Sequence, residues 1–163
     1  MIIKIVVLII IILIFVIYQL YFKHYFKVKN IYETLRNFLD VRDSLVLKLI
    51  PEIKNDVVRE NIIALIEERK ENFKTSYNNS IKADAKLNSS LRVFYEEINK
   101  LEKNDVINSV FGKVIKLEKD LKNIRNEYSL EVEEYNNNLV KHKFVCLKII
   151  KMKPLDTYKV KGK

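Results

Sequence analysis

The sequence is poor in the residues that make turns and cross-links. Its 163 residues include two glycines, two prolines, one cysteine and no tryptophan. Strands, hairpins and phosphate-binding loops all depend on turn residues, so this shortage favours long helices. The single cysteine, Cys146, excludes an internal disulfide bond and any zinc or iron–sulfur site built from several cysteines.

Candidates for catalysis are also few. A hydrolase needs an acid/base pair, or a nucleophile with its base, and the histidines are limited to His24 and His142. His142 and Cys146 would share a helical face, but two ligands make an incomplete metal site. The acidic pairs at 67–68 and 133–134 are adjacent in sequence, and adjacent side chains on a helix diverge by about 100°. We therefore predict a protein that is not an enzyme, with no catalytic, cofactor-binding or metal-binding residues.

One long apolar run is present at the N-terminus. Residues 5–22 carry no charge, and 18 residues are enough to cross a hydrocarbon core of about 30 Å. Aromatic residues gather at the end of the run, as an interfacial belt would: Tyr18, Tyr21, Phe22 and Tyr25. Signal peptidase needs small residues before its cut, and here they are bulky. We predict an uncleaved transmembrane anchor over residues 1–24. Residues within this span include Ile5, Ile10, Phe15 and Phe22.

The flanking charges predict an orientation. Basic residues accumulate on the cytoplasmic side of a membrane. Lys4 precedes the run, whereas Lys23, Lys27 and Lys29 follow it. This asymmetry favours an outside N-terminus and a cytoplasmic C-terminal domain.

Four stretches after the run repeat apolar residues at spacings of three and four, which is typical of amphipathic helices. They cover residues 31–53, 58–81, 87–101 and 110–139. No stretch sustains the period of two that a strand requires, so no sheet is predicted. The sequence therefore predicts an all-α fold, an antiparallel bundle of about four helices over residues 25–153. The first of these helices would continue directly from the transmembrane helix.

Polar or helix-breaking residues separate the stretches. Pro51 would either open the second helix or kink one long helix. Residues 78–80 and 88–90 bracket a weak stretch near residue 82, and Asn104–Asp105 would cap the last helix. In that helix Glu131 stands where an apolar residue is due. The apolar stripe shifts there by one residue, to Val132. An antiparallel bundle tolerates such a shift better than a strict two-stranded coiled coil does.

The net charge of +9 is concentrated at the C-terminus, where residues 141–163 contain eight lysines and one acidic residue, Asp156. Four antiparallel helices would bring this region back to the membrane. We predict that the basic C-terminal tail, residues 154–163, and the segment before it contact anionic lipid headgroups. The headgroup contacts would be Lys148, Lys151, Lys153 and Lys159. A frayed basic tail is the alternative, and the nearby membrane makes lipid a better candidate than nucleic acid.

Short elements along the chain also occur in a fixed order. They include Leu-Arg-Asn at 35–37, Leu-Ile-Pro-Glu-Ile at 49–53, Leu-Ile-Glu-Glu-Arg at 65–69, Asn-Ile-Arg-Asn-Glu-Tyr at 123–128, Tyr-Asn at 135–136 and Lys-Pro at 153–154. This order and spacing resembles the LemA family of bacterial membrane proteins over nearly the whole chain. The resemblance implies a bacterial, membrane-tethered antiparallel helical bundle without catalytic activity.

We therefore expect a single-pass protein of the bacterial plasma membrane that acts as a scaffold or adaptor. Its partners would be the lipid bilayer and one or more unidentified proteins, self-association included. The alternative is a membrane-surface module that binds or remodels lipid through its basic C-terminal segment. We expect no cofactor, small-molecule substrate or nucleic acid.

Overall fold

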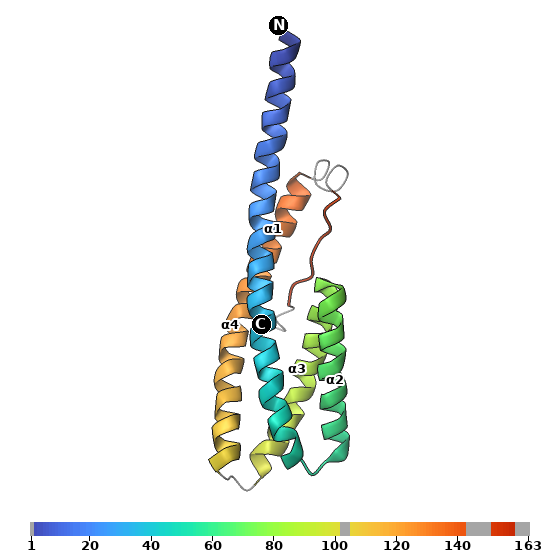
Figure 1. Ribbon diagram of the computed structural model, residues 1–163, viewed down its shortest axis with the longest axis vertical. Coiled ribbons are helices and arrows are strands. Elements are labelled where there is room, and N and C mark those ends of the chain that lie inside the picture. The colour runs from blue at the N-terminus through green and yellow to red at the C-terminus, as the bar shows by residue number, and fades with distance from the viewer. Residues whose placement is uncertain (1, 102–104, 143–150, 159–163) are drawn as a thin grey trace.

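The computed structural model describes residues 2–101, 105–142 and 151–158. Its helices are α1 (Ile2–Leu49), α2 (Asp56–Thr75), α3 (Tyr77–Lys100) and α4 (Asp105–Lys141), with a short 3-10 helix (Ile50–Glu52) after α1. The described ranges contain no strand. The predicted all-α bundle of about four helices is therefore confirmed (Figure 1).

Helix α1 is much longer than the bundle that it enters. Its 48 residues span about 72 Å at 1.5 Å per residue, and its N-terminal part projects beyond the other helices (Figure 1). Helix α1 contains an 18-residue apolar stretch that is long enough to cross a membrane, and none of that stretch is buried in the bundle. Because α1 contains neither glycine nor proline, it passes without a break from the apolar run into the bundle, as predicted.

The helices form two antiparallel pairs. Helix α1 packs mainly against α4, and α2 packs mainly against α3 (Figure 1). The 37 residues of α4 carry it back along α1 towards the apolar run. Near its end, the rings of Tyr25 and Tyr135 lie 6.3 Å apart, and Ile17 packs in the same apolar cluster as Leu139. This places the end of α4 beside the apolar run, as the number of antiparallel helices predicts.

The junction between α1 and α2 differs from both alternatives that Pro51 suggested. The proline neither opens α2 nor kinks a continuous helix, since it lies in the 3-10 turn that follows Leu49. Helix α2 begins later because the side chain of Asn55 accepts hydrogen bonds from the backbone N–H groups of Val57 and Val58.

The predicted break near residue 82 is also wrong. Helix α2 ends at Thr75 and α3 begins at Tyr77, so Ser76 alone separates them. The polar residues at 78–80 and 88–90 lie within α3. Ser80 is tolerated there because it is buried with partners: its hydroxyl lies 2.5 Å from the Tyr32 hydroxyl and donates to the Tyr77 carbonyl. At the start of α4, Asp105 is the first helical residue, and Asn104 lies outside the described residues.

The core has apolar clusters towards both ends of the bundle. One lies at the end away from the apolar run and includes Ile62, Leu91 and Phe94. Another lies near the apolar run and includes Tyr32, Tyr128 and Val132, and a small cluster around Leu35, Leu39 and Leu121 adjoins it. Buried charged side chains lie in the middle of the bundle, between these clusters.

Candidate functional site

A set of charged side chains crosses the middle of the bundle, and we call it the charge layer. It contains three arginines and four carboxylates drawn from all four helices. Its members are Asp40, Arg42 and Asp43 of α1, Arg69 of α2, Asp84 of α3, and Glu118 and Arg125 of α4. Arg42, Asp43, Arg69 and Asp84 have no solvent exposure. Charges this deeply buried are tolerated only when they are paired and hydrogen-bonded.

Helices α1 and α2 are joined through Arg69. Its Nε donates to Asp43 Oδ2 at 2.7 Å, and its Nη2 donates to Asp40 Oδ1 at 2.8 Å. The same guanidinium lies 4.9 Å from the centre of the Phe73 ring, a distance at which cation–π attraction is significant. One arginine therefore connects two helices that belong to different antiparallel pairs.

Asp84 connects α3 to both α1 and α4. It accepts from Arg42 Nη2 at 3.0 Å and from Arg125 Nε at 3.1 Å. Burial works against the charge of Asp84, but the two guanidiniums outweigh burial and hold the pKa of Asp84 below its usual value. Burial likewise opposes the charge of Arg42, whose pKa is nevertheless raised by Asp84 and Asp43. Asp84 and Arg42 are therefore both charged at neutral pH.

An open groove of about 1470 Å³ runs between α3 and α4, over the exposed edge of the charge layer. Asp84, Glu118 and Arg125 contribute to its base. Its walls are otherwise polar and carry both signs of charge, with Asn88, Ser89 and Arg92 from α3 and Lys122, Asn126 and Glu133 from α4. This lining can hydrogen-bond to a polypeptide, and the chain itself provides an example.

Residues 151–158 lie against the bundle, and we call them the C-terminal segment. They run back from the end of α4 towards the middle of the bundle (Figure 1). Asn136 of α4 donates to the Leu155 carbonyl at 2.8 Å and accepts from the Leu155 N–H at 3.0 Å. Asn78 of α3 accepts from the Asp156 N–H at 2.8 Å, and Ser129 accepts from the Tyr158 N–H at 3.2 Å. Side chains of α3 and α4 thus hold backbone groups of the segment.

Tyr158 brings the segment to the charge layer. Its ring lies 5.9 Å from that of Tyr128, and the Arg125 guanidinium lies 5.7 Å from its centre. Burial raises the pKa of Tyr158 well above its usual value, and the Asp84 carboxylate raises it further. The phenol is therefore neutral while the segment is in place.

The lysines predicted to contact lipid are only partly described. Lys151 and Lys153 are exposed on the C-terminal segment, while Lys148, Lys159 and Cys146 lie outside the described residues. Residues 154–158, which were predicted to belong to the basic tail, pack on α3 and α4 through Leu155 and Tyr158.

Of the residues predicted to span the membrane, Ile5, Ile10 and Phe15 are at least half exposed, and Phe22 contacts the rings of Tyr18 and Tyr25.

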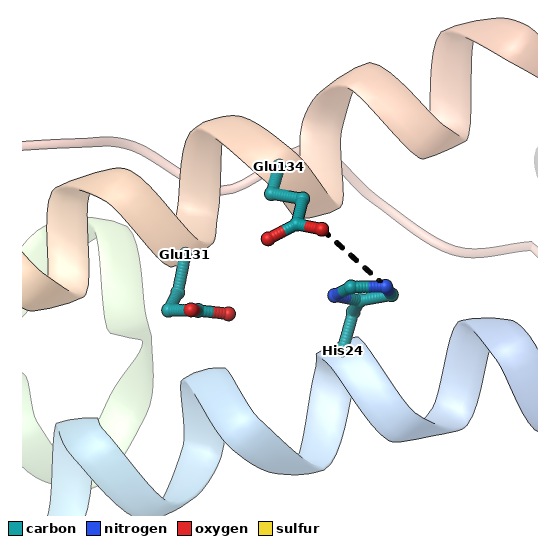
Figure 2. A group of neighbouring side chains, drawn as sticks. All are labelled: His24, Glu131 and Glu134. Atoms are coloured by element: carbon teal, nitrogen blue, oxygen red, sulfur yellow. Dashed lines mark ion pairs between the residues drawn. The ribbon is translucent and has the colours of Figure 1, made fainter.

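A second polar group forms where α1 meets the end of α4. His24 faces Glu131 and Glu134, and its Nε2 lies 3.8 Å from Glu134 Oε1 (Figure 2). The Lys27 ammonium forms an ion pair with Glu131. The sequence offered one signal for this group, the acidic residue at 131 in an apolar stripe, but it did not indicate the partners on α1. The first stretch of the sequence, residues 31–53, likewise has Arg42 at a position where an apolar residue is due, and this was the sequence signal for the charge layer.

The charge layer can be tested by substituting Asp84→Asn, which keeps the shape and removes the charge. Arg42 and Arg125 would then be buried without their shared carboxylate, so we expect the free energy of unfolding to fall by about 3–5 kcal/mol. The measurement is urea denaturation of the full chain in detergent, followed by circular dichroism. Glu97→Gln is the control, because Glu97 pairs with Lys100 at the surface and should contribute less than about 1 kcal/mol. Equal losses in the two variants would contradict the assigned role of the layer.

Attachment of the C-terminal segment can be tested with Asn136→Ala. The substitution removes two hydrogen bonds to Leu155, so we expect amide exchange in residues 151–158 to accelerate about tenfold. Hydrogen–deuterium exchange with mass spectrometry measures this directly. Asn137→Ala is the matched control, since Asn137 is an exposed neighbour on the same helix. Unchanged exchange in Asn136→Ala would mean that other contacts hold the segment.

No protein-family description, curated protein or solved structure matches this chain. The resemblance to the LemA family therefore stays a prediction.

Proposed function

We propose that this protein is a non-enzymatic scaffold or adaptor of the LemA type, anchored by one helix in the bacterial plasma membrane. The observation that carries the proposal is the continuity of α1, whose apolar run and bundle-forming half belong to one unbroken helix. A helix without glycine or proline is stiff, so the bundle would be held in a fixed position close to the bilayer. Fixed presentation of a surface is what a scaffold requires.

The surface that we propose for a partner is the part of the α3–α4 groove that the C-terminal segment does not occupy. It lies beyond Tyr158, on the side away from the apolar run. Next to it, the chain's own segment lies extended and is held by asparagine and serine side chains. Asn88, Ser89 and Asn126 continue the same kind of lining beyond Tyr158. An extended polar segment of a partner protein would therefore find equivalent hydrogen-bonding groups there. A second copy of this chain is the alternative occupant.

We propose an outside N-terminus and a cytoplasmic bundle. The support is the excess of Lys23, Lys27 and Lys29 on the bundle side of the apolar run over Lys4 on the other side. Cytoplasmic and membrane-bound proteins would then be the available partners.

The second candidate function is a lipid-binding or remodelling module. Lys151 and Lys153 are exposed, and they lie in the segment that follows the return of α4 towards the apolar run. In a membrane they would be near enough to attract anionic headgroups by about 1 kcal/mol each. This function would use the C-terminal segment and leave the groove free.

Membrane insertion and orientation are tested together by cysteine labelling. In a Cys146→Ser background, Val57→Cys places one thiol at the far end of the bundle, where Val57 is 77% exposed. We expect a membrane-impermeant maleimide to label this thiol only after the cells are permeabilised. Labelling of intact cells would place the bundle outside, and recovery of the protein in the soluble fraction would contradict the anchor.

The two candidate functions are separated by photo-crosslinking in cells. A photoreactive amino acid at Ser89 lies in the groove, one at Lys153 lies on the C-terminal segment, and one at Val57 serves as the control. The scaffold proposal expects a discrete protein adduct at Ser89, with a mass that distinguishes a partner from a second copy. The lipid alternative expects lipid adducts at Lys153 and no protein adduct at Ser89. Identical adducts at Ser89 and Val57 would contradict the groove as the binding surface.

A further inference from the structure

The group at the meeting point of α1 and α4 has the composition of a metal site. His24 comes from α1, while Glu131 and Glu134 are three residues apart on α4 and therefore share a face (Figure 2). One ligand atom from each residue lies within 4.8 Å of the other two. Imidazole and carboxylate are common ligands of zinc and related ions.

The spacing suits a small ion. In a tetrahedral zinc site with bonds of about 2.0–2.1 Å, neighbouring ligand atoms lie about 3.3 Å apart. His24 Nε2 and Glu134 Oε1 are separated by 3.8 Å. Small side-chain rotations would close that difference without moving either helix. Glu134 is partly exposed, so its carboxylate has room to make them.

A buried oxygen supports the same conclusion independently. Glu131 is only 9% exposed, and its Oε2 has no hydrogen-bond partner among the described residues. His24 Nδ1 is also buried and without a hydrogen-bond partner there. Burying polar atoms without partners costs free energy, and a bound cation would remove that cost for the carboxylate. This distinguishes the group from an exposed cluster of acidic side chains, which water alone satisfies.

We propose, contrary to the prediction from the sequence, that His24, Glu131 and Glu134 bind a divalent first-row transition ion such as Zn²⁺, with water completing its coordination. The imidazole favours such an ion over Ca²⁺ or Mg²⁺, which prefer sites made entirely of oxygen ligands. Three protein ligands and an exposed Glu134 leave an open position for the water. The bound ion would connect α1 to α4 directly beside the apolar run.

Lys27 would compete with the metal ion for the Glu131 carboxylate. Its ammonium occupies Glu131 in the metal-free protein, and two positive charges cannot share that carboxylate without repulsion. The Lys27 side chain is 55% exposed, so it can turn into solvent when the ion binds. This role makes a prediction that a simple ion-pair cluster does not make: removal of Lys27 should strengthen binding of the ion.

The test uses the full chain, purified in detergent with chelator and then dialysed free of it. Titration with Zn²⁺ in a calorimeter gives stoichiometry and affinity, and Tm with and without Zn²⁺ gives an independent readout. We expect one ion per chain and a Tm that rises to a plateau. His24→Gln and Glu134→Gln should each weaken binding by about tenfold or more, whereas Lys27→Met should strengthen it. Circular dichroism confirms that each variant remains helical.

The double variant His142→Gln/Cys146→Ser is the matched control, because it removes the other histidine and the only thiol. It should bind Zn²⁺ as the unaltered chain does. Absence of saturable binding, loss of binding in the control, or unchanged affinity in His24→Gln would overturn the site. These outcomes do not depend on a protein partner or on the orientation in the membrane, so they are distinguishable from failure of the proposed function.

Discussion

The pairing of buried charges across the middle of the bundle is the constraint on which the rest of the structure depends. Apolar packing joins α1 to α4 and α2 to α3, but it is not directional and would tolerate sliding of one pair past the other. Arg42, Arg69 and Arg125 each need a carboxylate on another helix at hydrogen-bond distance. Such contacts permit a single register, because any shift would leave a charge buried without its partner. The groove and the docked C-terminal segment both lie over this fixed base.

Much of the architecture could be predicted from residue types and their spacing. The shortage of glycine and proline, together with apolar repeats of three and four, indicated long helices and an unbroken α1. The boundary between α2 and α3 could not be predicted from the sequence, because polarity alone does not distinguish a loop from a buried, hydrogen-bonded polar residue. Ser80 and Asp84 both lie in the stretch where a break was predicted, and both are completely buried. Their partners, Tyr32 and Arg42, are on α1, and only the folded chain brings them together.

The candidate sites were harder to predict for the same reason. The lysines near the C-terminus were conspicuous in the sequence, yet the C-terminal segment is held by Asn78, Ser129 and Asn136, whose side chains bind backbone groups. Such contacts have no sequence periodicity. Glu131 did interrupt an apolar stripe, and the structure explains the interruption by its position opposite Lys27 and His24. A polar residue in an apolar stripe was therefore the most informative feature of the sequence, at position 42 as well as at position 131.

The length of the projecting part of α1 has a consequence for clearance above the membrane. Residues 5–16 are the part of the apolar run that no other helix covers, and they span about 18 Å, whereas a hydrocarbon core is about 30 Å thick. In the proposed arrangement, the end of α4 and the start of the C-terminal segment would therefore lie within the headgroup region. No exposed length of α1 would then separate the bundle from the membrane surface. Any change in tilt of α1 that follows bilayer thickness would then swing the groove through the same angle, so that the bilayer itself would set the direction in which the groove faces.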